Sequence, residues 1–328
     1  METKSASTLS IPDSRSSKPR RTRSPPGSGS PSTAPIIGPA APARGWPALA
    51  ATLPAVKLTV TVITLNEADH IEFALSSVAW ADEIIVIDSG STDGTVDIAR
   101  RHATRVEVLD WPGYGAQKNR AADLASNDWI LSLDADEHVP ADLADEIRGV
   151  LEQPEAAGYR IPRVTWYLER WIRSTDWYPD PQLRLYDRRV GRWSLRQVHE
   201  SVEMPQQPGR LTHELEHYAY RDVSHHLRTI DRYTTLAAEQ WAAEGRRTTA
   251  LAAIIHPPLA FLRNYVVRGG FRDGGAGLLV SALNSYYVFL KLVKLWERQQ
   301  KAPRAVAKAT LEAGHPRHEQ PDRPTRAR

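Results

Sequence analysis

The chain contains no cysteine among its 328 residues. This excludes disulfide frameworks, cysteine-ligated zinc or iron–sulfur sites, and catalysis by a thiol. A plain transmembrane run is also missing, because the most apolar stretch, Leu278–Trp296, is interrupted by Asn284, Lys291 and Lys294. Neither sign of charge dominates, since 42 Lys and Arg face 39 Asp and Glu. With ten Trp and eleven Tyr, the composition is typical of a globular protein rather than a disordered one.

The two ends of the chain differ in composition from its middle. Residues 1–55 hold ten of the 24 prolines and carry seven basic residues against two acidic ones, which predicts a disordered arm. Residues 300–328 are polar and basic, and we expect a second disordered tail there. Between them we expect a domain at 56–222, divided near residue 140, and a helical extension at 223–299.

Short strands and helices alternate through the first part of that domain. The predicted strands are Lys57–Thr64, Glu83–Asp88, Arg105–Leu109 and Trp129–Leu133. The predicted helices are His70–Trp80, Thr95–Arg101, Tyr114–Ala125 and Ala141–Leu151. Nearly continuous apolar strands separated by helices indicate a mainly parallel sheet with helices on both faces, so the fold class is α/β.

The segment from Gly158 to Tyr220 has a different character. Short strand candidates, Gln182–Tyr186 and Leu211–Tyr218, are mixed with many Trp, Tyr and Arg residues. This pattern predicts a small mixed-sheet extension of the parallel sheet. After Asp222 the chain is expected to be helical.

Polar residues gather where the predicted strands end. The residues that follow the first, second and fourth strands are Asn66 and Glu67, then Asp88, then Asp134, Asp136 and Glu137. In an open parallel sheet, ligands bind beyond the carboxyl ends of the strands. Carboxylates that share one crevice repel each other unless a cation lies among them. The pattern therefore predicts a site for Mg²⁺ or Mn²⁺ that would in turn hold a diphosphate, although strand-end acids can also be ordinary turn formers and caps, as we expect for Asp93.

Four segments in this order carry a resemblance to a known family: VITLNE (62–67), VIDSGSTDGT (86–95), QKNR (117–120) and LSLDADE (131–137). Together they resemble the family 2 glycosyltransferases of GT-A fold, which implies a Rossmann-like, mainly parallel sheet and here a helical C-terminal extension. Three later segments, WYPD (177–180), LRL (183–185) and VHE (198–200), resemble a narrower group. These are the lipopolysaccharide-core β-1,4-glucosyltransferases that add glucose to an inner-core heptose.

The resemblance implies roles for individual residues. Those expected at the nucleotide-sugar site are Thr64, Glu67, Asp88, Lys118 and Asp134. Thr64 and Glu67 would line the nucleoside site, and Asp88 would contact the uracil. Lys118, which stands where many relatives have Arg, would hold the nucleotide, Asp134 would meet the ribose or sugar, and Asp136 would ligate the metal. Residues 56–140 would then be the nucleotide-binding half and 141–222 the acceptor half. The Gln-x-x-Arg-Trp motif of processive members is missing, which favours addition of a single sugar.

An inverting transfer needs a base that deprotonates the acceptor hydroxyl. Glu200 is the candidate, because it lies downstream of the metal motif as the base does in this family. Asp180 and Glu137 are its rivals, and a surface strand acid is the alternative for Glu200 itself. His199 could orient the base or be a core histidine.

Several further residue groups permit more than one interpretation. The Trp and Tyr residues at 166, 167, 171, 177, 178 and 193 suit an acceptor groove or a core equally well. Nine Arg against four acids between Arg160 and Arg196 suit a phosphorylated acceptor. His213 and His217 could bind zinc only on one helix, and a strand is expected there. One of the histidines at 213, 217, 225 and 226 could instead complete the shell of the catalytic metal.

The helical extension carries broad apolar faces. In 278–298 a narrow polar stripe opposes an apolar face with aromatic residues, and Pro257–Val267 is similar, with Arg263 and Arg268 beside it. Such helices bury against a domain or lie in a membrane interface, and we expect the second.

The function predicted from the sequence is therefore a metal-dependent inverting glycosyltransferase. It would transfer a hexose, glucose above others, from a UDP-sugar to an anionic glycolipid such as the lipopolysaccharide core. We expect it in the cytoplasm, peripheral on the inner face of the cytoplasmic membrane. The alternatives are a polyprenyl phosphate or protein acceptor, or a non-catalytic protein whose basic arms bind anionic lipid or nucleic acid. No nucleic-acid motif is present in the core, so we expect no nucleic acid partner.

Overall fold

The computed structural model describes residues 56–195 and 200–313, with side chains described as far as residue 301. The arm expected at 1–55 lies outside the described residues, as do His199 and the last part of the tail expected at 300–328.

The first half of the main sheet is parallel. Its strands are β1 (Leu58–Thr64), β2 (Glu83–Asp88), β3 (Arg105–Val108) and β4 (Trp129–Asp134), arranged in the order β3-β2-β1-β4. The four strand predictions are confirmed to within one residue at each end. In the register of β1, Thr64 lies beside Asp88 of β2, and Ile63 lies beside Asp134 of β4. The three strands therefore end level, and the residues that follow them meet at one edge.

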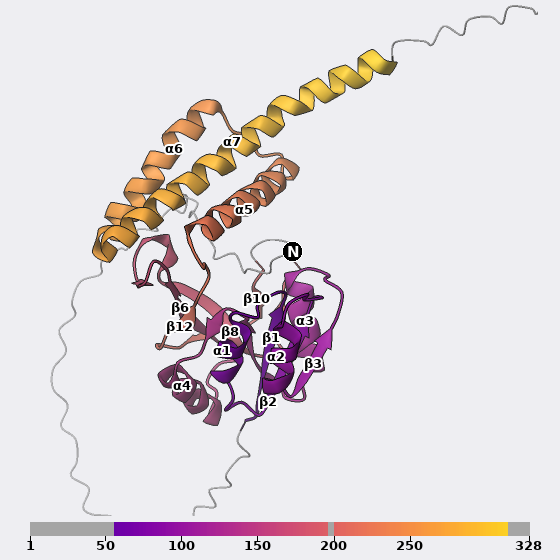
Figure 1. Cartoon of the computed structure of the whole chain (residues 1–328), viewed down its shortest axis with the longest axis vertical. Coiled ribbons are helices and arrows are strands. Elements are labelled where there is room, and N and C mark those ends of the chain that lie inside the picture. The colour runs from indigo at the N-terminus through magenta and orange to yellow at the C-terminus, as the bar shows by residue number, and fades with distance from the viewer. Residues whose placement is uncertain (1–55, 196–199, 314–328) are drawn as a thin grey trace, which may run out of the picture. The chain divides into compact units, whose positions relative to one another are not determined.

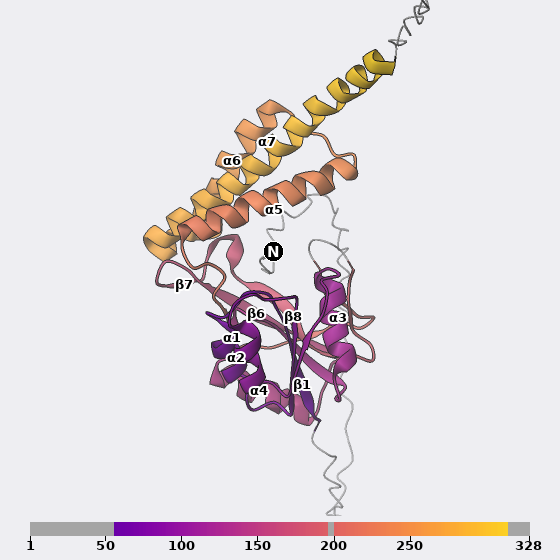
Figure 2. The ribbon, with the colours of Figure 1, turned by 45° about the vertical axis from the view of Figure 1, so that its right-hand side comes forward.

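Helices cover both faces of this half, as expected. They are α1 (Ile71–Ser76), α2 (Thr95–His102), α3 (Tyr114–Leu124) and α4 (Ala141–Glu152). Residues of α1, α2 and α4 share one buried cluster with alternate side chains of β1, such as Val60 and Val62. On the other face, Ala121 of α3 packs against Ile63 and Ile87. Figure 2 shows α3 on one side of β1 and the other three helices opposite it.

The helix α1 is shorter than the predicted 70–80. After Ser76 the backbone tightens, because the Ser77 hydroxyl donates to the carbonyl of Ala74 (2.6 Å) and competes with the helical pattern.

The second half of the sheet is mixed. Its strands are β5 (Glu137–His138), β6 (Gly158–Trp166), β8 (Asp180–Asp187) and β12 (Leu215–His217), with β7 (Trp171–Ile172) and β11 (Gly209–Arg210) at β6. The strand β8 pairs antiparallel with β4 and with β6. A separate pair joins β9 (Arg192–Trp193) to β10 (Val202–Glu203). The mixed sheet is confirmed, but the strand predicted at 211–218 is reduced to the three residues of β12.

Three long helices follow the sheet. They are α5 (Val223–Ala243), α6 (Ala250–Leu262) and α7 (Gly274–Ala313); a π-helical turn η2 (Arg263–Val267) and a 3₁₀ turn η3 (Gly270–Asp273) lie between the last two, and a further 3₁₀ turn, η1 (Thr175–Trp177), precedes β8. Both α5 and α6 pack along α7 (Figure 1). The predicted helical end at 299 is wrong, because α7 continues to Ala313 through a segment rich in Ala and Lys, which are strong helix formers.

Candidate active site

The loops after β1 and β2 are locked to each other by side chains. The Asn66 carboxamide oxygen accepts from the Thr92 amide (2.8 Å), and the Asn66 amide donates to the Ser91 hydroxyl (2.7 Å). Asn66 has φ 56°, a left-handed conformation that Asn adopts more readily than most residues. Asp88 shapes the second loop by accepting from the Gly90 (2.8 Å) and Ser91 (2.7 Å) amides and from the Ser91 hydroxyl. The strand-end edge is thus preorganised.

Thr64 and Glu67 lie in the same edge and are buried. The Glu67 amide donates to the Thr95 hydroxyl at the start of α2 (2.9 Å), which fixes the chain after β1. The Thr64 hydroxyl has no hydrogen-bond partner among the described residues.

Lys118 joins residues that the sequence placed at the site from separate motifs. Its Nζ lies 3.0 Å from Oδ1 of Asp134 and 3.5 Å from Oε1 of Glu200. The same Nζ lies 4.2 Å from the ring centroid of Trp193, and the Lys118 side chain is almost completely buried. Lys118 therefore connects α3, the end of β4 and the segment before β10.

Close packing of α3 against β9 holds Lys118 there, and sequence reasoning missed it. The Asn119 side chain donates to the Trp193 carbonyl (2.8 Å) and accepts from the Trp193 amide (3.0 Å), as a neighbouring strand would. A Cβ at Gly115 would lie 1.9 Å from the Ser194 carbonyl oxygen, so only glycine permits this approach. The sequence features that could have indicated this close contact are the QKNR segment and Gly115, two residues before it.

A buried network of arginines and carboxylates lies behind Asp134, and it was not predicted either. Arg184 of β8 contacts both Asp134 and Glu137, and Arg163 of β6 contacts Glu137 (2.9 Å) and Asp180 (2.6 Å). Burial by itself would raise the pKa of Asp134, but the charges of Arg184, Lys118 and Arg163 outweigh it and hold that pKa well below its usual range. Asp134 is therefore ionised at neutral pH.

The three candidate bases differ in their ion-pair partners. Glu137 is fully buried and held by two arginines, and its second oxygen accepts from the Asp134 amide (3.0 Å). Asp180 is held by two nitrogens of Arg163. Glu200 instead forms its ion pair with Lys118, and its side chain keeps 9% exposure. Of the three, Glu200 is the one carboxylate that no arginine contacts in the ion pairs of the described residues.

Asp136 has a histidine as its neighbour. Oδ2 of Asp136 lies 3.5 Å from Nε2 of His217 on β12, and both side chains are buried. A carboxylate beside an imidazole is a donor set that fits Mn²⁺ or Mg²⁺. In residues 56–195 and 200–301 no three His, Asp or Glu side chains lie close enough together to bind one metal ion. Asp136 and His217 would therefore supply only part of the coordination of a metal bound there.

The remaining histidines have other partners. His213 is half exposed and lies 2.9 Å from Glu146, away from the buried His217, so the zinc pair considered from the sequence does not form. His226 of α5 contacts the Tyr167 hydroxyl (3.0 Å) and stacks on Tyr220.

Most of the arginines in 160–196 are paired within the fold. Besides Arg163 and Arg184, ion pairs join Arg173 to Glu214, Arg189 to Asp187 and Arg192 to Asp123. Three of the aromatic residues likewise pack within the fold, since Tyr167, Trp177 and Trp193 are buried in hydrophobic clusters. Core packing, rather than an open groove, accounts for these three.

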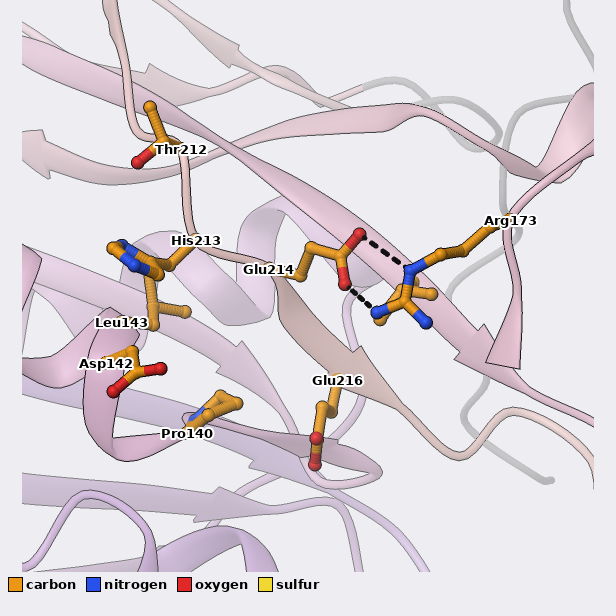
Figure 3. A pocket seen from close by; sticks show the side chains of 9 residues that line it. Pro140, Asp142, Leu143, Arg173, Thr212, His213, Glu214 and Glu216 are labelled. Atoms are coloured by element: carbon orange, nitrogen blue, oxygen red, sulfur yellow. Dashed lines mark hydrogen bonds and ion pairs between the residues drawn. The ribbon is translucent and has the colours of Figure 1, made fainter. Parts of the chain in front are cut away.

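A pocket of about 320 Å³ lies elsewhere, between α4 and β12 (Figure 3). Asp142, His213, Glu214 and Glu216 line it together with Arg173, which is paired to Glu214. His213, considered from the sequence for zinc, is in its lining, but none of the residues predicted for the nucleotide-sugar site, the metal or the base is, so the strand-end site and this pocket are different places.

Comparison with known proteins finds similarity to glycosyltransferases. Residues 59–202 match the model of Glycosyl transferase family 2. The lipopolysaccharide core biosynthesis glycosyltransferase LpsC of Rhizobium meliloti (strain 1021) is 29% identical over 254 residues, which are 75% of this chain and 94% of LpsC. An uncharacterised glycosyltransferase of Rickettsia felis is 28% identical over 77% of this chain and 94% of its own length. The mannosyltransferase PcManGT from Pyrobaculum calidifontis, solved with GDP-Man and Mn²⁺, is 17% identical, covers 73% of this chain and 86% of its own, and has a TM-score of 0.43. The chain is thus a glycosyltransferase, and its residues 59–202 match the model of Glycosyl transferase family 2.

Proposed function

We propose that the chain is a metal-dependent, inverting hexosyltransferase that transfers glucose from UDP-glucose to a lipopolysaccharide-core or similar anionic glycolipid acceptor. The observation that carries this proposal is that Asp88 and Asp134 end the two strands beside β1 at one sheet edge, with Asp136 two residues after Asp134 and Lys118 bridging Asp134 to Glu200. Similarity to LpsC over three quarters of the chain supports the acceptor class.

The nucleotide-binding half is residues 56–140 in this proposal, and the acceptor half is residues 141–222. Thr64, Glu67 and Asp88 would receive the nucleoside in the locked loops after β1 and β2. Lys118 and Asp134 would face the nucleotide and the sugar. The positive charge of Lys118 suits a diphosphate, because an ammonium group binds phosphate oxygens as a point charge.

Asp136 and His217 would hold Mg²⁺ or Mn²⁺, with the remaining ligands coming from the donor and from water. A divalent ion bound there would stabilise the negative charge that develops on the leaving UDP.

Glu200 would act as the general base. It would take the proton of the acceptor hydroxyl while that oxygen attacks C1 of the donor sugar from the side opposite UDP. The new bond from the acceptor oxygen to C1 forms as the bond from C1 to the UDP oxygen breaks, so the configuration at C1 inverts. The proton ends on Glu200, and the electron pair of the broken bond leaves with UDP.

A lipid-linked acceptor would also explain the helical extension. Two segments, Ala250–Val267 and Gly270–Lys301, are long and apolar enough to cross a membrane by length and composition, with mean hydropathy 1.3 and 1.4. We propose peripheral association with the inner face of the cytoplasmic membrane.

The first test is calorimetric titration of UDP with and without Mn²⁺. We expect binding that requires the metal in the wild type and is lost in Asp136→Asn, while Asp142→Asn, an acid outside the site on α4, behaves as wild type. Failure of UDP to bind the wild type with Mn²⁺ present would refute the UDP-sugar donor.

A second variant tests the base. Glu200→Gln should bind UDP as the wild type does but lose roughly 10²–10⁴-fold in kcat for transfer, which is the usual contribution of a positioned base. Transfer by Glu200→Gln at the wild-type rate would return the role to Asp180 or Glu137.

A further inference from the structure

We propose that one apolar face of α6 and η2 docks on an anionic lipid bilayer and thereby holds the acceptor half of the domain at the membrane surface. This deepens the membrane association proposed above and rests on that proposed function for its purpose. The face, called here the docking face, is formed by Leu251, Ile254, Ile255, Leu259, Leu262 and Val266.

The docking face points outward. Its six side chains recur at steps of three and four residues and are between 47 and 66% exposed. On a helix at the surface of a water-soluble domain this stripe would be polar and the apolar stripe would face inward. Val267, at the end of the same stretch, is 79% exposed and extends the docking face by one residue. A contiguous exposed apolar surface of this kind marks an interaction site.

The inner side of the same helices contains buried polar side chains as well as apolar ones such as Val280 and Leu295. Asn284 of α7 donates to Asn264 of η2 (2.9 Å), and the Ser285 hydroxyl of α7 donates to the Pro257 carbonyl of α6 (2.7 Å). A Cβ at Gly277 would lie 1.8 Å from the Gly270 carbonyl oxygen, so small residues bring the backbones together. Polar and small residues inside with apolar residues outside are typical of helices that contact lipid.

The basic residues around the docking face favour an anionic lipid surface as its partner. Arg246 and Arg247 precede α6, and Arg268 and Arg272 follow η2, so cations lie at both ends of the docking face. Arg246 is paired with Glu244 and Arg268 with Asp176, whereas Arg247 and Arg272 form no ion pair among the described residues and remain exposed. This arrangement complements anionic headgroups, whereas a second copy of the chain would bring like charges together.

The docking face is joined to the acceptor half by buried polar contacts. Asp273 accepts from the Arg173 amide (3.0 Å) and from the Ser174 hydroxyl, and Asn264 donates to Asp176 (3.0 Å). These residues lead directly into β8, which begins at Asp180. The docked helices would therefore fix the distance between the membrane surface and the active site, where a lipid-anchored acceptor must bind.

The test uses the full chain and preformed vesicles of phosphatidylcholine alone or mixed with phosphatidylglycerol. We expect the wild type to sediment with the mixed vesicles and the double variant Ile254→Glu/Val267→Glu to bind roughly tenfold or more weakly. Val108→Glu/Val190→Glu, which places the same two charges on exposed apolar residues of the sheet domain, is the matched control and should bind as wild type.

The charge of the rim is tested separately. Arg247→Gln and Arg272→Gln should each weaken binding to the mixed vesicles about fivefold, and added salt should reduce the difference. Wild-type binding that is equal on both kinds of vesicle would overturn the anionic lipid assignment.

Two further results distinguish lipid docking from self-association of the chain and from failure of the proposed function. Unchanged binding by Ile254→Glu/Val267→Glu refutes the docking face, as does a wild-type dimer in lipid-free solution that this variant converts to a monomer. The double variant should still bind UDP with Mn²⁺ as the wild type does. Vesicle binding without UDP binding would refute the proposed function and leave the docking face standing.

Discussion

The sheet domain (residues 56–222) and the helical extension (α5 to α7) differ in where they place large apolar side chains. Val60, Val62 and Leu131 are completely buried in the sheet domain, whereas Leu251 and Ile254 of α6 are mostly exposed and Asn264 is buried beneath them. Burial of apolar surface from water drives the packing of the first region. Residues of the same type therefore indicate a core in one region and a contact surface in the other.

The interior of the sheet domain also contains charged side chains. Arg163 and Arg184 are among its largest fully buried side chains, and they lie where the mixed half meets the parallel half. Buried charges are tolerated only when they are paired, and here three carboxylates supply the pairing.

Removal of Arg163 should produce the largest loss of stability. Arg163→Met leaves Glu137 and Asp180 without a common partner, and we expect the free energy of unfolding to fall by about 3–5 kcal/mol. Chemical denaturation measures it. Arg160→Met, on the same strand but partly exposed, is the control, and an equal loss in both variants would show that the ion pairs are not responsible.

The stability effects of replacing one isoleucine in each region compare the two regions directly. Ile130→Ala empties a completely buried position of β4 and should cost about 2–5 kcal/mol, whereas Ile255→Ala on the docking face should change the free energy of unfolding in lipid-free buffer by less than about 0.5 kcal/mol. Similar losses in the two variants would mean that Ile255 is covered in solution.

The polar interior of the extension gives an intermediate effect. Asn284→Leu removes the acceptor for the Trp177 indole nitrogen (3.1 Å) and the donor to Asn264. Because buried polar groups then lose their partners, we expect a loss of about 1–3 kcal/mol in thermal or chemical unfolding. Ala282→Leu, which introduces the same side chain at an exposed position of α7, is the control and should have little effect. A stabilised Asn284→Leu variant would contradict the polar interior described above.

The joint between the two regions should be sensitive to acid. Burial and, to a smaller extent, the charge of neighbouring His225 lower the pKa of His226 to about 3 from an ordinary value of 6.5. Tyr167, Tyr220 and Trp177 also face this ring. The unfolded chain takes up the proton first, so the stability due to neutral His226 is complete above about pH 6.5 and is lost as the pH falls toward 3. The slope should reach about 1.4 kcal/mol per pH unit. Unfolding measured at several pH values should show a smaller slope in His226→Phe, and an unchanged slope would contradict this origin.

The parallel half of the sheet was predictable because its signals are local. Apolar runs of strand length, such as Glu83–Asp88, alternate with amphipathic helices, and polar residues mark the points where the strands end. The level ends of β1, β2 and β4 follow from parallel pairing, so Thr64, Asp88 and Asp134 could be placed at one edge before their register was known.

Contacts between distant segments were not predictable in the same way. Nothing near His217 in the sequence indicates Asp136 as its neighbour, and the partners of Arg163 and Arg184 come from three strands. The Arg-rich composition of 160–196 suggested phosphate binding, whereas most of these cations are paired to carboxylates within the fold. Composition counts charges but does not show which of them neutralise each other.

The sequence by itself determined the elements of the parallel half, the order of its motifs and the apolar character of the last helices, because periodicity and turn chemistry act over a few residues. Only the tertiary structure decided which carboxylates arginines hold, which histidine lies beside Asp136 and which side of α6 faces outward. Those outcomes depend on how strands and helices far apart in the chain are paired, since desolvation and ion pairing act between neighbours in space.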